Sequence, residues 1–527
     1  MYQSRRLFLL AALLAISGAA VAEPRVASTE LIGSFSGHDA ALHPDNQAPI
    51  PIEYYGTDLG FTYQHQGQIH ILFGDTWATE AYAPIESSTG ARFDDGFGTI
   101  DPAGWEDPGK IGPNNIPRIR LGQHEGSGEM SAIDPGHAMD LGHTPMGGFS
   151  NGNDQFGIFN ITKPQGCRQD SDCANGLSCD SGLGYYGTPY SEETGLTLPC
   201  IDGMPLCQAQ TEAGDEPAPS GFCIDRSSTV WAETPTGRVS SSGLRVLIGM
   251  RSKSDPRKYT DTRTWLTNKF VNVTARTVDD FAPAGGTPAV LLWGRPGFVG
   301  VGANGRSLGL YFGYVDMPQG ADYAWKVNYY TGTQDGVPQF SANEAEAAPL
   351  DLDAGETGTQ PAEPHDVVHQ MSVSFVEALN KWVMFYGGGI SVLPSPVLPS
   401  CGVLELFARF ECKDVDIGNG GIHMRTADHP FGPWSPPQEV VAGGDPDVPN
   451  SGQYGPGGAL HHPACTGENC ATPTRTVHYH DNEYGFLYAA NIIEPWTHAS
   501  AGGVEILWNA STWDPYRVVL FRTRITP

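Results

Sequence analysis

The chain has 527 residues, a formal net charge of −29 at pH 7, 66 Gly, 42 Pro and 10% aromatic residues. A chain this acidic repels phosphate groups, so we expect neither nucleic acid nor an anionic membrane surface as a partner. Its Gly, Pro and aromatic content favours short strands with tight turns over a helical bundle. The hydrophobic content of 39% is enough for a folded core, which argues against wholesale disorder.

The first 22 residues have the form of an export signal. A basic start (MYQSRRLFLL) and an apolar stretch (AALLAISGAAV) lead to the small residues Ala20–Ala22 before Glu23. The apolar stretch is short for a membrane span and no second one follows, so we expect no membrane insertion. Residues 4–9 (SRRLFL) also fit the twin-arginine pattern, with an ordinary secretory signal as the alternative. We therefore expect a periplasmic or secreted protein after removal of residues 1–22.

All ten cysteines follow this signal, and six of them lie between positions 167 and 223. An even, clustered set in an exported chain predicts a disulfide framework, whose connectivity the sequence leaves open. Zinc is the alternative, but the wide spacing at the start of the cluster differs from the tight C-x2-C pairs of zinc sites. The cysteines are Cys167, Cys173, Cys179, Cys200, Cys207, Cys223, Cys401, Cys412, Cys465 and Cys470.

Runs typical of strands fill most of the remaining chain, after an irregular Pro-rich opening. Residues 54–77 contain two such runs around Gln66-Gly67, and a Gly-, Pro- and Asp-rich loop is expected from there to about residue 129. Residues 167–223 have almost no strand pattern and too few apolar residues for a core, so we interpret them as a disulfide-stapled surface insert. Strand patterns then return, with a Pro- and acid-rich linker at 341–366.

The recurring unit is a sheet of a few short antiparallel strands, and about five such units fit the chain. Sheets repeated radially around a channel leave only short, protected edges. We therefore predict an all-β, five-bladed β-propeller with a small disulfide-rich insert, and tandem sandwich domains are the alternative. The expected parts are the signal peptide (1–22), the first part of the propeller (23–166), the insert (167–223) and the remaining blades (224–527).

Two aspartates are the strongest candidates for chemistry. In a hairpin that turns between Gln66 and Gly67, Asp58 and Asp75 are equidistant from the turn, so their Cβ atoms are expected to lie roughly 4.5–5.5 Å apart. Like charges this close raise the pKa of one carboxyl, which allows one acid to donate a proton while its partner stays charged. Ordinary turn hydrogen bonds and a calcium site are the alternatives, and a single β-bulge would break the register.

The segments GTDLG and LFGDTW resemble the opening blade of the propeller family first filed as domain of unknown function 4185. Later segments are similar to later blades in the same order: LLWGRPGF, SLGLYFGYVD, KWVMFYGG, IHMRTADHPFGPWS, YGPGG and WDPYRVVLFRTRI. The resemblance covers most of the chain after the signal, except the insert. Members of that family include glycoside hydrolases that cleave D-arabinan, and the resemblance implies that Asp58 and Asp75 are the catalytic pair.

Three further residues are candidates for substrate contact. Trp77 adjoins the aspartate pair and could stack on a sugar ring, with core packing as the equal alternative. Arg295 could bind sugar hydroxyls or steady a carboxylate, with a solvent-facing place in a turn as the alternative. His461, after the Gly-rich YGPGG, could line the channel mouth, with an ordinary surface position as the alternative.

Residues 148–152 (GFSNG) match the G-x-S-x-G motif of serine hydrolases. That motif needs a strand–turn–helix in an alternating α/β fold, and neither is apparent in the sequence.

Two functions remain open. The first is an exported glycoside hydrolase that cleaves a furanose-containing polysaccharide such as arabinan, and the second is a non-catalytic propeller that binds carbohydrate or protein. Residues 369–372 (HQMS) favour the second, because propeller glycosidases often carry a glutamate there. No cofactor is required by the sequence, and a structural calcium ion is the one cation considered.

Overall fold

The computed structural model describes residues 23–34, 57–74, 76–77, 92–93, 97–100, 107–117, 119–121, 143–153, 155–161, 166–167, 169, 171, 178–180, 221–224, 232–233, 244–249, 270, 272–295, 309–317, 327–343, 346–352, 368–388, 421–444, 451–461, 486–512 and 517–527. Their regular elements are strands and four short 3-10 helices, at Pro108–Lys110, Ala282–Ala284, Gly452–Tyr454 and Glu494–Trp496. None of the helices in these ranges has the length and apolar character needed to cross a membrane. The predicted all-β class is confirmed.

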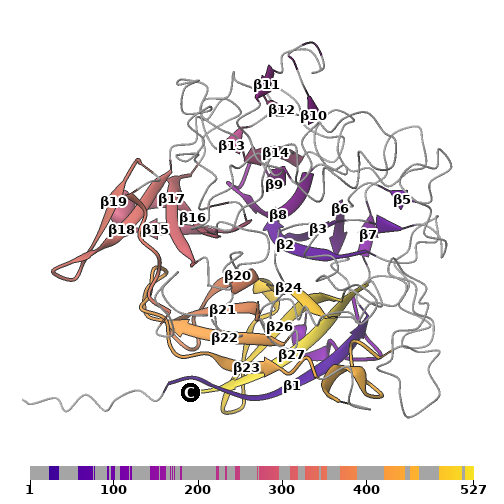
Figure 1. Cartoon of the computed structure of the whole chain (residues 1–527). Coiled ribbons are helices and arrows are strands. Elements are labelled where there is room, and N and C mark those ends of the chain that lie inside the picture. Colours follow the sequence, from indigo (N-terminus) through magenta and orange to yellow (C-terminus); the bar gives the residue numbers. More distant parts are fainter. Residues whose placement is uncertain are drawn as a thin grey trace, which may run out of the picture.

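Within these ranges, five sheets of four or five strands make up the body of the molecule (Figure 1). The first sheet has the order β2 (Leu59–His65), β3 (Gln68–Phe73), β6 (Phe97–Ile100) and β7 (Ile119–Leu121). The second has the order β8 (His143–Ser150), β9 (Gln155–Ile161), β14 (Leu244–Gly249) and β13 (Ala232–Glu233). The third has the order β15 (Asn272–Phe281), β16 (Thr287–Arg295), β17 (Tyr311–Asp316), β18 (Asn328–Gln334) and β19 (Val337–Ser341).

The last two sheets contain the C-terminal part of the chain. The fourth sheet has the order β20 (Val368–Val376), β21 (Lys381–Gly388), β22 (Ile422–Ala427) and β23 (Gln438–Val441). The fifth has the order β24 (Leu487–Ile492), β26 (Gly503–Thr512), β27 (Arg517–Thr526) and β1 (Arg25–Ser34), with β25 (His498–Ser500) paired to β26.

The sheets are arranged as a propeller. Their first strands, β2, β8, β15, β20 and β24, contact one another in this order, and β24 contacts β2 again, so the inner strands form a closed ring. Buried apolar clusters lie between neighbouring sheets: the third sheet packs on both the second and the fourth, and the fifth on both the fourth and the first. In a sandwich each sheet packs on a single partner, so the tandem-sandwich alternative is wrong.

Four of the five sheets are antiparallel throughout, as predicted for the recurring unit. In the second sheet, β14 runs parallel to β9. A parallel pair needs a long connection, and here the chain between β9 and β14 includes the insert. The prediction of a uniformly antiparallel unit is therefore wrong for this sheet.

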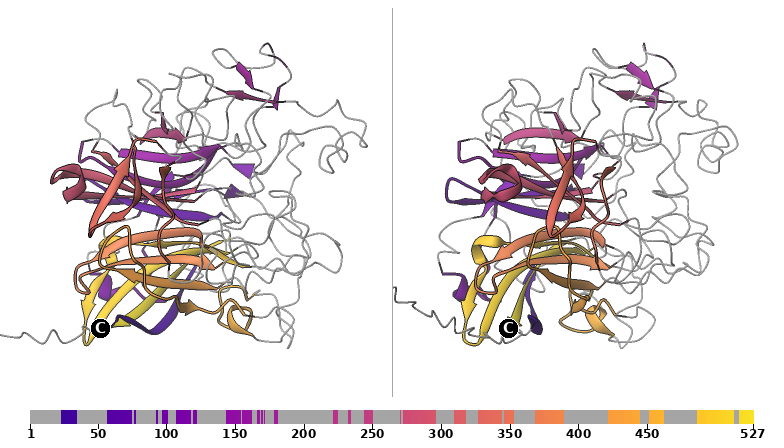
Figure 2. Two further views of the ribbon diagram at one scale, coloured as in Figure 1. Left: turned by 60° about the vertical axis from the view of Figure 1, so that its left-hand side comes forward. Right: turned by 90° about the vertical axis from the view of Figure 1, so that its left-hand side faces the viewer.

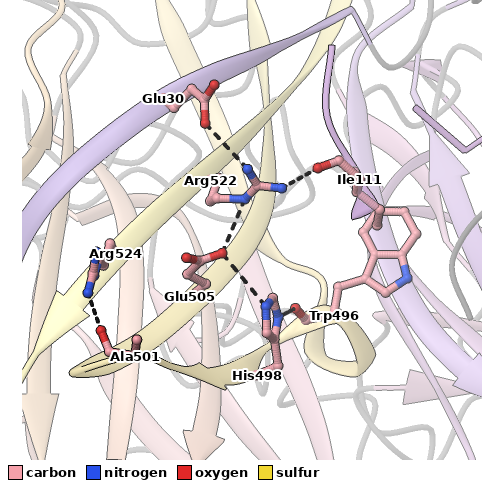
Figure 3. A network of polar contacts seen from close by, with 8 residues as sticks. All are labelled: Glu30, Ile111, Trp496, His498, Ala501, Glu505, Arg522 and Arg524. Atoms are coloured by element: carbon pink, nitrogen blue, oxygen red, sulfur yellow. Dashed lines mark hydrogen bonds and ion pairs between the residues drawn. The ribbon is translucent and has the colours of Figure 1, made fainter. Parts of the chain in front are cut away.

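The N-terminal strand β1 joins the two ends of the chain in one sheet. It pairs with the last strand, β27, where an irregular opening had been expected. Figure 3 shows polar contacts at this seam: Arg522 lies 3.4 Å from Glu30 and 3.4 Å from Glu505 and donates to the carbonyl oxygen of Ile111. Glu505 also lies 3.7 Å from His498. The ring of sheets is thus closed by pairing between the first and last described strands.

Two regions expected to lack strands contain them. Strands β6 and β7 fall within the predicted loop and complete the first sheet. The insert forms a small sheet with the order β10 (Gly166–Cys167), β12 (Gly221–Ile224) and β11 (Ser178–Asp180), which stands apart from the other sheets (Figure 2).

In this small sheet Cys179 lies opposite Cys223 in the ladder, and Cys167 lies opposite Gly221. The disulfide framework and its connectivity stay a prediction, and so does the export signal at residues 1–22, which lies outside the described residues. The other predicted disulfide cysteines also lie outside them: Cys173, Cys200, Cys207, Cys401, Cys412, Cys465 and Cys470.

A buried arginine at the centre of the ring binds several inner strands. Arg276 of β15 donates from Nε to the carbonyl oxygen of Val373 at 2.7 Å and from Nη2 to Ser372 Oγ at 2.9 Å. It also donates from Nη2 to the carbonyl oxygen of Ile492 at 3.2 Å and from Nη1 to that of Thr62 at 3.5 Å. One guanidinium thus connects the third sheet to the first, fourth and fifth.

Replacing this guanidinium tests its structural role. Arg276→Met removes the donor from several buried acceptors, so we expect a loss of about 3–5 kcal/mol in the free energy of unfolding, measured by urea denaturation. Arg276→Lys keeps the charge but reaches fewer acceptors and should lose less. The exposed Arg524→Met on β27 is the matched control, with an expected change below about 1 kcal/mol. An Arg276→Met protein of wild-type stability would contradict this role.

Candidate functional site

Asp58 lies directly before β2, at one end of the inner ring. From Phe61 to the turn the hairpin has the predicted register, with Phe61 opposite Leu72. A shift follows at Leu59 and Gly60, which have positive φ angles of 65° and 78°. Such a β-bulge adds a residue to one strand only.

The bulge changes the residue that faces Asp58. Leu59 pairs with Phe73, and the N–H of Gly74 donates to the carbonyl oxygen of Asp58 at 3.1 Å. Asp58 is therefore opposite Gly74, and the prediction that it directly faces Asp75 is wrong in register.

Asp75 itself lies outside the described residues, between Gly74 and β4 (Thr76–Trp77), which pairs with β5 (Arg92–Phe93). The approach of its carboxylate to that of Asp58 stays a prediction. The stacking role of Trp77 also stays a prediction, since only its backbone is described.

The fifth sheet holds the bulge in place. Asn509 Nδ2 donates to the carbonyl oxygen of Gly60 at 3.0 Å, and Ser511 Oγ donates to that of Leu59 at 3.2 Å. Asn491 Nδ2 donates to Asn509 Oδ1 at 3.1 Å, which orients the Asn509 amide. Gly60 has to be glycine here, because a Cβ would lie 2.6 Å from Asn509 Nδ2 and φ is positive.

The Asp58 carboxylate is held from two sides. Tyr488 Oη, from β24, donates to Asp58 Oδ2 at 2.8 Å. Asp58 Oδ1 lies against the backbone of Gly74, where an added Cβ would be 2.2 Å away. The residue is 9% exposed and its Oδ1 atom is buried, so the carboxylate has a fixed position. Such positioning on rigid strands suits a group that transfers a proton or attacks a bound substrate.

Arg295, at the end of β16, is completely buried. Burial lowers the pKa of its guanidinium well below the usual range. The alternative of a solvent-facing arginine in a turn is therefore wrong, and a contact of this side chain with a sugar or a carboxylate stays a prediction.

His461 lies half-buried after the 3-10 helix Gly452–Tyr454, with Nδ1 3.1 Å from the carbonyl oxygen of Tyr454. Arg517, at the start of β27, donates from Nη2 to the carbonyl oxygen of Ala459 at 2.8 Å. Through this contact, the loop that contains Ala459 and His461 packs on the same end of the fifth sheet as the bulge at Leu59 and Gly60, which Ser511 contacts. The loop of His461 and Asp58 therefore lie at the same end of the ring.

Comparisons with known proteins give only distant similarities. No protein-family model matches the chain, and none of the curated proteins searched is similar to it in sequence. A candidate hydrolase from Bacteroides ovatus has a TM-score of 0.35 and 11% identity, over 90% of this chain and 86% of that one. An alpha-L-arabinofuranosidase from Podospora anserina, solved in complex with cellotriose, has a TM-score of 0.28 and 9% identity, over 95% of this chain and 98% of that one. Both scores lie below 0.5, so these similarities assign no chemistry to this chain.

The G-x-S-x-G segment lies at the opposite end of β2 from Asp58. It ends β8 and turns directly into β9, so it has a strand–turn–strand context, and the serine hydrolase elbow is excluded as predicted. Ser150 Oγ lies 2.7 Å from His65 Nδ1 and accepts a hydrogen bond from the N–H of Gly152 at 2.9 Å. No sequence pattern indicates this contact, because the two residues lie 85 positions apart.

A buried histidine lies next to this contact. The ring of His70 stacks on Tyr63 with centroids 5.3 Å apart and lies 5.9 Å from the ring of His65. Burial, and then the charge of His65, lower the pKa of His70 to about 4. The folded protein therefore keeps His70 neutral at pH values where the unfolded chain protonates it.

This pKa shift predicts acid sensitivity. Between pH 6.5 and about 4 the unfolded chain binds a proton that the folded chain does not, so stability falls as the pH falls through this window. The loss amounts to at most about 3 kcal/mol. His70→Phe keeps the stack on Tyr63 without titrating, so its stability relative to wild type should rise as the pH falls from 7 to about 4.5. Urea unfolding of both proteins across this range measures the effect, and a constant difference would contradict the shift.

Proposed function

We propose that the protein is an exported glycoside hydrolase that acts on a furanose-containing polysaccharide such as arabinan. Asp58 is one catalytic carboxylate in this proposal, and Asp75 is the other. The observation that carries it is the fixed carboxylate of Asp58, held by Tyr488 and by the backbone of Gly74. A mostly desolvated carboxylate costs stability, and such groups are concentrated at functional sites.

Glycoside hydrolysis needs one carboxylic acid to protonate the leaving oxygen and one carboxylate to attack the sugar or activate water. The hydrogen bond that Tyr488 donates stabilises the charged form of a carboxylate. We therefore assign the nucleophile or base role to Asp58 and the proton-donor role to Asp75. A separation near 5–5.5 Å would give retention of configuration, and roughly 6.5–9.5 Å would give inversion.

The proposal includes a five-bladed propeller, in which each of the five sheets is one blade. The closed ring of inner strands and the apolar clusters between neighbouring sheets support this count. It also includes membership of the family first filed as domain of unknown function 4185, which the segments GTDLG and LFGDTW support.

The second candidate function is a propeller that binds carbohydrate without cleaving it. One observation favours it: residues 369–372 (HQMS), where propeller glycosidases often carry a glutamate, contain no acid, and Gln370 among them is completely buried on β20. A buried amide cannot replace a third acid at the site.

Removing the charge of Asp58 tests the proposal. Asp58→Asn should reduce the release of reducing sugar from D-arabinan, L-arabinan or another polysaccharide in a panel by about 10²- to 10⁴-fold. Tyr488→Phe, which only removes the hydrogen bond, should reduce it by about 10-fold or more. Asp335→Asn, in the exposed turn between β18 and β19, is the matched control and should act as wild type. Binding without any release would instead identify a binding protein.

Gly74→Ala tests the position of the carboxylate. The added Cβ would lie 2.2 Å from Asp58 Oδ1 and 2.8 Å from Leu59 Cδ1, so the carboxylate and the flexible end of Leu59 have to move, and kcat should fall by about 10-fold or more while the fold is retained. Gly112→Ala is the control, because its Cβ would meet no atom within 4 Å. Rates of hydrolysis and melting temperatures separate the two effects. An unchanged kcat in Gly74→Ala would show that the location of this carboxylate does not matter.

A further inference from the structure

A cavity of about 410 Å³ lies at the end of the inner ring opposite to Asp58. It is lined by the β2–β3 turn, the β8–β9 turn, part of β15 and the start of the 3-10 helix Glu494–Trp496. Thr62, the lining residue nearest to Asp58 along β2, is four positions from it, which is about 13 Å in an extended strand. Arg276, also on the wall, donates to the carbonyl oxygen of Thr62 and closes the cavity on the side of Asp58. The cavity is therefore separate from the candidate active site.

The walls of this cavity are mostly polar. Gln64 and Gln66 contribute exposed amides, Thr277 an exposed hydroxyl and Glu494 an exposed carboxylate. Amides and hydroxyls both donate and accept hydrogen bonds, and a carboxylate accepts them. This set matches the hydroxyl groups of a sugar, each of which also donates and accepts.

The charges favour a neutral ligand. Arg276 is the cation on the wall, and its guanidinium donates to carbonyl and hydroxyl oxygens of other sheets. Burial lowers the pKa of Arg276, while the negative charge of Glu494 raises it. That carboxylate repels an anion at the cavity mouth, and the polar walls disfavour an apolar ligand.

The turns around the cavity are rigid. Gln66 and Gly67 have positive φ angles of 48° and 77°, as in a tight hairpin turn. In the other turn, Ser150 Oγ binds the N–H of Gly152 and lies within hydrogen-bond distance of His65. The first turn is flanked by the paired residues His65 and Gln68, and the second is held by the bonds of Ser150, so the cavity exists without a ligand, which lowers the cost of binding.

We propose that this cavity is a second, non-catalytic carbohydrate site that binds a neutral saccharide of one or two rings. Gln64, Gln66 and Glu494 bind its hydroxyl groups. The volume lies within the usual range for small-ligand pockets. The site does not depend on catalysis by Asp58, since a propeller that only binds polysaccharide would use it equally well. On an enzyme, it would hold the polymer on the face of the ring opposite to the site of cleavage.

Titration of Asp58→Asn protein with sugars tests the proposal without turnover. The neutral probes are arabinose, galactose, cellobiose and arabinobiose, and galacturonate and inorganic phosphate are the anionic probes. Calorimetry or saturation-transfer NMR should detect at least one neutral sugar. Gln64→Ala and Glu494→Gln should each weaken its binding by about 3- to 10-fold, and Thr277→Trp, which fills the cavity, should abolish it.

The matched controls are exposed residues on other sheets: Gln334→Ala on β18 and Glu439→Gln on β23 should leave binding unchanged. The proposal is overturned if no neutral sugar binds, if only the anionic probes bind, or if the cavity variants bind as the controls do. In an otherwise wild-type chain, Gln64→Ala and Glu494→Gln should leave hydrolysis of soluble arabino-oligosaccharides unchanged. If the protein hydrolyses no substrate and these variants still lose sugar binding, the proposed catalysis is refuted and the proposed sugar site is not.

Discussion

Hydrogen bonds between the first and fifth sheets set the geometry on which the candidate site depends. Side chains of Asn509 and Ser511 donate to the two carbonyl groups of the bulge at the start of β2, and Tyr488 donates to the Asp58 carboxylate. The fifth sheet contains both ends of the described chain, because β1 pairs with β27. The position of Asp58 therefore depends on closure of the ring. We expect that disrupting the pairing of β1 with β27 also displaces the Asp58 carboxylate.

The Arg276 guanidinium connects the inner strands at the centre of the ring. It binds inner strands of three other sheets, and in doing so it lies between the two ends of the inner ring. Asp58 lies at one end and the polar cavity at the other. The same side chain thus stabilises the fold and keeps the two candidate sites apart, which allows each to be changed without the other.

The parts of the fold that depend on local patterns could be predicted from the sequence. The alternating runs around KWVMFYGG and IHMRTA form neighbouring strands of one sheet, and the Gln66-Gly67 turn sets the hairpin register as far as Phe61. The bulge could not be predicted, because the Asn509 side chain that holds it is 449 positions away. The strand β1 was missed for the same reason, since its partner is at the other end of the chain. Likewise, the burial of Arg295 follows from packing between sheets rather than from its Gly- and Pro-rich neighbours.

Chemical rescue tests the central claim most directly, because it asks whether the Asp58 carboxylate takes part in the reaction. Asp58→Ala removes this carboxylate and leaves space for a small anion, so azide added with an arabinan-type substrate should restore turnover and form a sugar azide. The account predicts an inactive Asp58→Ala protein whose activity rises with azide, while Asp335→Ala is active and unaffected. A fully active Asp58→Ala protein would contradict the account. The account would also be contradicted if the wild type hydrolyses the substrate but the Asp58→Ala protein forms no sugar azide at any azide concentration.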